Sequence, residues 1–291
     1  MRFDRYEMLP APKKGKMKMI QDIYPSKLYN EYKICEMRDD DTAFYFDAAG
    51  RLMTWEENGT ITFLAKKEIG EQQGIYLFAI DAKRYFLVTE EPADPRDGYS
   101  YRSIREIRDF GVTGNDIFAV FTAYHLWRWY ADNRYCGKCA EELVPGTEER
   151  SLVCPKCKNT IYPRINPAVI VGVTNGDKLL LTKYRRGYGH NALVAGFTEI
   201  GETLEETVAR EVMEETGVKV KNIRYYKSQP WGMAQDILVG YYCDADGDST
   251  IHMDEGELKY AEWVQREEIE LQPNNLSLTN EMMRIFKEGK I

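Results

Sequence analysis

The sequence predicts an α+β protein with an N-terminal antiparallel β-rich domain, a short cysteine-rich segment and a C-terminal domain of layered strands and helices. Three observations lead to this prediction. Alternating apolar and aromatic runs fill most of the first 100 residues, two CxxC pairs follow, and helical periods join strand patterns in the last part of the chain. We expect the three parts to span residues 1–130, 131–161 and 162–291.

Composition narrows the class of protein. The chain has 291 residues with 39 basic and 47 acidic side chains, which gives a formal net charge of −8 and the profile of an ordinary globular protein. It has no apolar run of about 18 residues and no apolar N-terminal stretch, so we expect no membrane span, no secretory signal and a cytoplasmic location. An acidic chain argues against a dedicated nucleic-acid binder. A small basic cluster is interpreted as a solvated segment: Lys13, Lys14, Lys16 and Lys18.

The first domain is expected to consist of strands and turns followed by a helix. Strand-like alternation occurs at residues 43–46, 60–64, 75–80 and 85–88. Turn signals lie at 47–50 and 57–60. Apolar residues then recur at helical spacing from Ile117 to about Tyr135. Because this part contains no metal, nucleophile or phosphate motif, we expect it to support a site elsewhere.

The cysteine pairs predict a structural metal site. They are separated by 14 residues and supply four thiols: Cys136, Cys139, Cys154 and Cys157. Two tight turns can aim four thiolates at one zinc ion, which leaves no open position for water. A zinc ribbon that stabilises the fold is favoured over a redox pair, which would need a βαβ setting. It is also favoured over an RNA-binding ribbon, because four glutamates between the pairs would repel phosphates.

The last part predicts a sheet with helices packed on it. Strands are expected at residues 168–173 and 178–181, joined by a hairpin turn at 175–177, and again near 237–243 and 260–264. Helices are expected at 204–216 and about 279–287. In the first helix, Thr203 and Glu206 can form a capping box, and Gly217 suits the left-handed position that ends it.

One face of this helix concentrates negative charge. The i, i+3 and i+4 positions of one face hold three carboxylates: Glu211, Glu214 and Glu215. Crowded carboxylates repel one another, so Mg²⁺ or Mn²⁺ is the natural counter-charge. Arg210 can pair with Glu206 and Glu214 at a spacing of four residues. The opposite stripe, with apolar residues every four positions, would pack on the sheet.

Residues 196–218 match the pattern G-x5-E-x7-R-E-U-x-E-E-x-G-U at every defined position. Seven fixed residues at a usage of roughly 7% each would match by chance at on the order of one start in 10⁸. The chain therefore resembles the Nudix hydrolases. The resemblance implies a Nudix α/β/α sandwich that hydrolyses a nucleoside diphosphate linked to another moiety. It implies metal ligands at Glu211, Glu215 and the carbonyl of Ala195, and a ligand or general base at Glu214.

Three further features resemble the NADH pyrophosphatase branch of that family. These are the preceding zinc ribbon, the link over 161–167, and the sequence Ser228-Gln229-Pro230-Trp231, which opens the branch's SQPWPFPxS array. The array then departs to Gly-Met-Ala-Gln-Asp over 232–236, which we expect to make the loop more flexible at Gly232 and which places a carboxylate at Asp236.

The resemblance to this branch implies further site residues. Phe197 and Tyr162 would stack on a base or nicotinamide ring. Glu257 would bind metal, with Glu262 as the competing candidate, and Arg105 matches a substrate contact only weakly. The remaining implied substrate contacts are Glu149, Ser228, Gln229, Pro230, Trp231 and Asp236. The branch forms homodimers, so a homodimer is implied here too.

We therefore expect metal-dependent hydrolysis of the pyrophosphate of NADH or NAD to nicotinamide mononucleotide and AMP, with NAD-capped RNA as a further candidate substrate. Mg²⁺ or Mn²⁺ would be catalytic and Zn²⁺ structural. Two alternatives stay open. One is another Nudix substrate, such as ADP-ribose or a diadenosine polyphosphate, which the altered residue Asp236 favours. The other is a non-catalytic nucleotide sensor, which the intact glutamate pattern disfavours.

Overall fold

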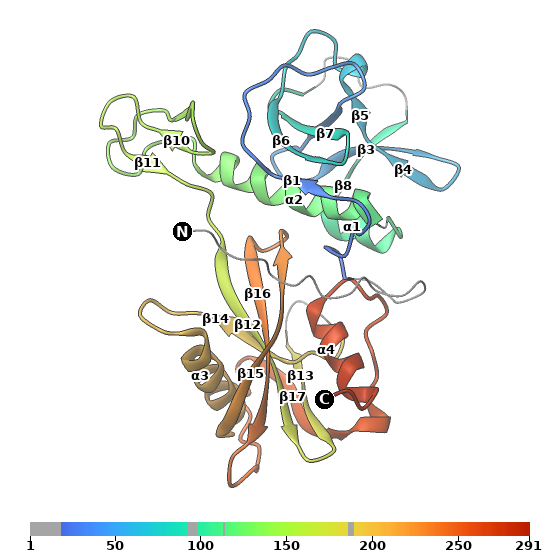
Figure 1. Cartoon of the computed structure of the whole chain (residues 1–291), viewed down its shortest axis with the longest axis vertical. Coiled ribbons are helices and arrows are strands. Elements are labelled where there is room, and N and C mark those ends of the chain that lie inside the picture. The colour runs from blue at the N-terminus through green and yellow to red at the C-terminus, as the bar shows by residue number, and fades with distance from the viewer. Residues whose placement is uncertain (1–18, 92–97, 113, 186–188) are drawn as a thin grey trace.

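The computed structural model describes residues 19–91, 98–112, 114–185 and 189–291. Two sheet-based bodies lie one above the other in Figure 1, with a long helix crossing beneath the upper body and the cysteine-rich segment beside it. The basic cluster expected to be solvated, which ends at Lys18, lies outside the described residues. Within the described residues, no helix is both long and apolar enough to cross a membrane.

The upper body contains two sheets, with strand orders β1-β6-β7-β2-β5 and β4-β3-β8. The strands are β1 (Leu28–Tyr29), β2 (Thr42–Tyr45), β3 (Leu52–Glu57), β4 (Thr60–Thr62), β5 (Leu64–Ala65), β6 (Ile75–Ile80), β7 (Lys83–Val88) and β8 (Tyr99–Arg102). The helices are η1 (Lys66–Glu68), α1 (Ile104–Asp109) and α2 (Gly114–Asp132). The expected turn at 57–60 is present, because Asn58 and Gly59 take the left-handed φ values of 51° and 74° that a tight hairpin requires.

Two expectations for this body need correction. The sheet is not wholly antiparallel, because β2 and β7 pair in parallel. The chain leaves β2 for the second sheet and returns through β5 and β6, so no hairpin joins β2 to β7. The long helix also ends at Asp132 and not at Tyr135, since Tyr135 already forms a bridge with Glu142 that opens the ribbon.

The ribbon is a small three-stranded sheet in the order β11-β10-β9. Its strands are β9 (Val144–Pro145), β10 (Leu152–Val153) and β11 (Thr160–Ile161). The ribbon has a separate small core, in which Trp129 of α2 packs with Leu143, Leu152 and the four cysteines. The last helical residues before the ribbon therefore anchor it.

The lower body is a six-stranded mixed sheet in the order β15-β16-β12-β13-β17, with β14 paired to β12. Its elements are β12 (Asn166–Asn175), β13 (Lys178–Tyr184), β14 (Val194–Phe197), α3 (Leu204–Thr216), β15 (Val220–Trp231), β16 (Asp236–Ala245), β17 (Leu258–Gln265), η2 (Arg266–Glu268) and α4 (Leu278–Lys287). Alternate residues of β12 face opposite sides, so Val169 and Val171 pack with Val208 and Val212 of α3 while Ile170 packs in the core beneath α4. The predicted α/β/α sandwich is confirmed.

The hairpin between β15 and β16 is docked against α2. The rings of Trp231 and Phe121 meet edge to face with centroids 5.2 Å apart. A Cβ atom on Gly232 would lie 2.0 Å from the carbonyl oxygen of Phe121. Glycine therefore allows a close backbone approach here, and the expected flexibility of the loop at Gly232 stays a prediction.

Candidate active site

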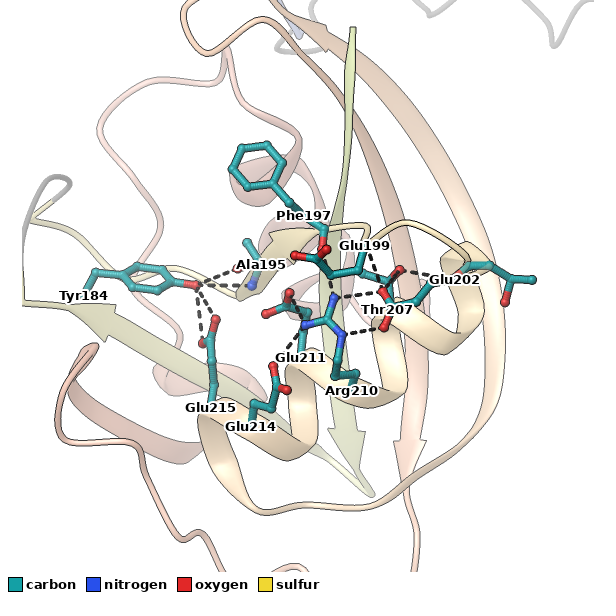
Figure 2. A network of polar contacts seen from close by, with 11 residues as sticks. Tyr184, Ala195, Phe197, Glu199, Glu202, Thr207, Arg210, Glu211, Glu214 and Glu215 are labelled. Atoms are coloured by element: carbon teal, nitrogen blue, oxygen red, sulfur yellow. Dashed lines mark hydrogen bonds and ion pairs between the residues drawn. The ribbon is translucent and has the colours of Figure 1, made fainter.

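Helix α3 presents the site, and its ends follow the sequence rules. The Glu206 amide donates to the Thr203 hydroxyl over 3.2 Å, and the Thr203 amide donates to the Glu206 carboxylate over 2.7 Å. Gly217 ends the helix at φ 70°. The predicted capping box and C-terminal glycine are both confirmed. They fix where the helix begins and ends. Val208 and Val212 pack on the sheet, and the glutamate face turns toward β14 (Figure 2).

Arg210 organises this face. Its Nε donates to Oε1 of Glu202 over 2.6 Å. Its Nη1 donates to Glu211 over 2.7 Å and to Glu214 over 2.9 Å. The Nη2 of Arg210 donates to the Phe197 carbonyl over 2.9 Å. The guanidinium group thus ties the start of the loop to the carboxylates (Figure 2), and it lowers the pKa of Glu202 to about 2.

The expected partners of Arg210 are therefore half right. The pair with Glu214 is present, but the pair with Glu206 is wrong because the capping box already uses that carboxylate. Sequence reasoning did not assign a role to Glu202, although it is a defined position of the glutamate pattern. That position was the available signal.

Five carboxylates line one cavity of about 340 Å³: Glu211, Glu214, Glu215, Asp254 and Glu257. Burial raises the pKa of Glu215 to about 8, and the charges of Glu211 and Glu257 add to the rise. Burial also raises the pKa of Glu211. These groups offer only oxygen ligands and need positive charge to ionise together, which suits a hard divalent cation.

The last metal ligand implied by the sequence is Glu257, and the structure brings it into this cavity with the helix glutamates. Its competitor Glu262 is exposed on β17, opposite Leu181 of β13, and does not line the cavity. Asp254 was missed. Its amide donates to the Glu215 carbonyl over 2.9 Å, which attaches the 254–257 turn to the end of α3. The acidic residue three positions before Glu257 was the only hint in the sequence.

Ala195 lies on β14 beside the same glutamates. The hydroxyl group of Tyr184 accepts the Ala195 amide over 3.2 Å, lies 3.4 Å from the Ala195 carbonyl and lies 3.1 Å from Oε1 of Glu215. Sequence reasoning missed Tyr184 because nothing local marks the end of β13 as part of a site.

The aromatic candidates lie outside the acidic cavity. Phe197 is 53% exposed, two residues beyond Ala195 on β14, and its ring points away from the glutamates (Figure 2). Tyr162 is 55% exposed and donates its hydroxyl proton to Glu149 over 2.7 Å. The structure thus pairs Tyr162 with Glu149 at the ribbon and leaves both rings free to contact a ligand.

The Ser-Gln-Pro-Trp sequence ends β15, and its residues alternate. Ser228 and Pro230 are exposed, whereas Gln229 is fully buried. The Gln229 amide nitrogen donates to the Leu276 carbonyl over 2.9 Å, and its oxygen accepts the Leu278 amide over 2.7 Å. The start of α4 thus uses the polar atoms of Gln229, and its expected contact with substrate stays a prediction.

Three other candidates are placed away from the cavity. Trp231 packs against α2, and Arg105 is exposed on α1. Asp236 is 5% exposed, and its carboxylate accepts the side-chain amide of Asn166 over 3.5 Å. Burial raises the pKa of Asp236 to about 6.

The four cysteines form a compact cluster with sulfur atoms that all lie within 4.8 Å of one another. Two of the separations are 3.6 Å, between Cys136 and Cys157, and 3.5 Å, between Cys139 and Cys154. A zinc tetrahedron with bonds of about 2.3 Å has edges of about 3.8 Å, so the cluster fits zinc with little movement. Four thiolates close the shell, and the site is structural.

Comparison with known proteins agrees with this architecture. Residues 131–162 match the NADH pyrophosphatase zinc ribbon domain, and residues 164–284 match the NUDIX domain. A NAD-capped RNA hydrolase NudC from Shigella dysenteriae serotype 1 is 35% identical over 207 residues, which are 71% of this chain and 74% of that protein. The protein of the same name from Escherichia coli O157:H7 is 34% identical over 208 residues, with the same shares.

A solved Nudix hydrolase from Nitrosomonas europaea is 23% identical, with a TM-score of 0.47, and the match covers 53% of this chain and 91% of that one. The acidic helix on an α/β/α sandwich defines a hydrolase that uses divalent metal. With the ribbon and the two relatives, the chain belongs to the NADH pyrophosphatase family of Nudix hydrolases, and it is an enzyme.

Proposed function

We propose that the enzyme hydrolyses the central pyrophosphate of NADH or NAD, giving nicotinamide mononucleotide and AMP, with Mg²⁺ or Mn²⁺ in the acidic cavity. One observation carries the proposal: five carboxylates gather in a cavity beside a strand that also presents the exposed ring of Phe197. A pyrophosphate flanked by two ring systems matches this combination of an oxygen-rich cavity and a flat apolar face.

The residues divide the work in this proposal. Glu211, Glu215, Glu257 and the Ala195 carbonyl would hold the divalent ions. When bound, such ions neutralise the phosphates, orient them and acidify a water molecule. Arg210 keeps the glutamate face assembled, because it joins Glu211 to the loop that precedes the helix. The main contribution of the protein to the rate is then the positioning of the substrate and the ions, since phosphoryl transfer needs little covalent participation from the protein.

Glu214 is the candidate general base. Its side chain is 60% exposed, and Arg210 contacts only one of its two carboxylate oxygens, Oε2. The other oxygen is free of that contact and can accept the proton of an attacking water. Glu215 is a poorer candidate because it is buried and is already hydrogen-bonded to Tyr184.

NAD-capped RNA is a second substrate in this proposal, since both relatives are named as hydrolases of such RNA. A capped RNA presents the same pyrophosphate to the cavity. Phe197, Tyr162 and Glu149 are the proposed contacts for the ring systems, and the exposed Ser228 and Pro230 are further candidates. The cytoplasmic location and the homodimer stay predictions from the sequence.

Product analysis after incubation with NADH and Mg²⁺ or Mn²⁺ tests the proposal. The expected products are AMP and reduced nicotinamide mononucleotide. Glu214→Gln and Glu215→Gln should each lower turnover by orders of magnitude with the fold intact, because proton acceptance or metal binding is lost. Glu262→Gln is the matched control and should keep wild-type activity, since that carboxylate lies outside the cavity.

Other outcomes would overturn parts of the proposal. Undiminished activity in both variants would reject the assigned roles. A strong preference for ADP-ribose or a diadenosine polyphosphate over NADH would replace the substrate. Nucleotide binding without cleavage in any metal would indicate a sensor.

A further inference from the structure

The end of strand β13 contacts a carboxylate of the acidic cavity, Glu215, through the hydroxyl group of Tyr184. A register shift between Lys183 and Tyr184 interrupts the pairing of β13 with β17, where Lys183 faces Tyr260 and Tyr184 faces Leu258. Such an irregularity redirects the side chain that follows it. Here it accompanies a tyrosine that turns toward the carboxyl-terminal end of α3 (Figure 2).

The hydroxyl group of Tyr184 has one proton to donate and has several neighbours. Its shortest contact with an acceptor is 3.1 Å, to Oε1 of Glu215, while the Ala195 carbonyl is 3.4 Å away. The hydroxyl oxygen of Tyr184 also accepts the Ala195 amide proton over 3.2 Å. Donation to Glu215 leaves the lone pairs of the Ala195 carbonyl available. One hydroxyl therefore fixes a carboxylate and an adjacent peptide together.

The next residue, Arg185, connects the end of β13 to the segment that carries Glu257. The Arg185 amide donates to the Glu257 carbonyl over 3.0 Å, and its Nε donates to the Leu258 carbonyl over 3.0 Å. On the other side, the Asp254 amide is bound to the Glu215 carbonyl. The end of β13 thus contacts, directly or through the backbone, elements that carry three of the proposed oxygen ligands: Glu215, Ala195 and Glu257.

We propose that Tyr184 is a positioning residue that holds the Glu215 carboxylate against the Ala195 peptide so that both oxygen ligands face the divalent ion. This inference rests on the proposed function only for the identity of the metal site. Groups that hydrogen-bond to metal ligands typically change metal affinity by 10-fold to 100-fold when they are removed.

The test is Mn²⁺ titration of the zinc-loaded protein, followed by electron paramagnetic resonance without nucleotide. Tyr184→Phe removes the hydroxyl and keeps the ring, and it should weaken Mn²⁺ binding by about 10-fold or more. The matched control is Tyr260→Phe on the adjacent strand, because that hydroxyl bonds to Asn191 over 3.1 Å and not to a carboxylate of the cavity. The control should keep wild-type affinity.

Two results would overturn the inference: equal Mn²⁺ affinity in Tyr184→Phe and wild type, or an equal loss in Tyr260→Phe. Unfolding midpoints of the zinc-loaded proteins without added Mn²⁺ or Mg²⁺ should agree among the three proteins, which separates positioning from a general loss of structure. In steady state, Tyr184→Phe should lower kcat and leave the KM for NADH unchanged. Because Mn²⁺ is titrated without nucleotide, failure of NADH hydrolysis would leave this result interpretable.

Discussion

Two regions of this chain are suited to metal, and they are built in opposite ways. The ribbon takes its four thiols from two short turns close in sequence, and these sulfurs approach one another within 4.8 Å. The acidic cavity takes its carboxylates from α3 and from the turn at 254–257. Among the described residues, its carboxylates form no group as tight as the thiols, since Arg210 draws Glu211 and Glu214 toward itself.

The difference separates a structural site from a catalytic one. A complete thiolate shell has no position left for substrate, so its metal can only stabilise the fold. Carboxylates that are held by hydrogen bonds and stay partly open leave room for phosphate and water. Removing a ligand should therefore lower stability in the ribbon and activity in the cavity.

The largest effect is expected at Glu211. Glu211→Gln should lower kcat by about 10³-fold or more, which corresponds to roughly 4 kcal/mol of transition-state stabilisation. In the zinc-loaded protein without added Mg²⁺ or Mn²⁺, the variant should be at least as stable as the wild type, because burial and like charge already disfavour the ionised carboxylate. Steady-state kinetics and thermal unfolding measure the two quantities. A large loss of stability would contradict the division between the regions.

Cys154→Ser should give the reverse result. Zinc content should fall below one per chain, and the free energy of unfolding should fall by about 4 kcal/mol, because a structural metal contributes folding energy. Metal analysis and denaturant unfolding test this expectation. Cys35→Ser, a half-buried thiol outside the cluster, is the control. If Cys154→Ser lost activity at full zinc content and stability, the ribbon would not be structural.

Glycines sharpen the comparison further. A Cβ atom on Gly196 would lie 1.9 Å from the carboxylate carbon of Glu211, whereas one on Gly137 in the ribbon would meet no atom within 4 Å. Gly196→Ala should displace Glu211 and lower kcat by about 100-fold, since a shift of roughly 1 Å is enough for such a loss. Gly137→Ala should leave activity and stability unchanged. Wild-type activity of Gly196→Ala would show that the cavity tolerates movement.

The smallest effect concerns Asp236, a buried carboxylate outside both regions. Its pKa in the folded protein is about 6, above the ordinary value of 3.8, so folding favours the protonated form. Stability should therefore fall as pH rises from about 4 to about 6. Asp236→Asn removes this titration and should be more stable than wild type by about 3 kcal/mol at pH 7.5, with little difference at pH 4. Denaturant unfolding at both pH values checks this; a difference independent of pH would contradict it.

Local patterns predicted much of the fold, the thiol cluster and the three glutamates that α3 brings to the acidic cavity. The predicted helix at 204–216 matches α3 at both ends, because its capping box and terminal glycine act within a few residues. The thiol cluster was equally predictable from spacing. The three glutamates on α3 follow from helical periodicity alone.

The sequence by itself determined which residues share a turn, a helix face or a CxxC pair, since these relations depend on the local geometry of the backbone. Only the tertiary structure decided that Tyr184 meets Glu215, that Asp254 joins the end of α3, and that Gln229 is buried under α4. The parallel pairing of β2 and β7 belongs to the same group. These contacts join residues far apart in the chain, and they depend on which sheet edges and helix ends meet when the whole core packs.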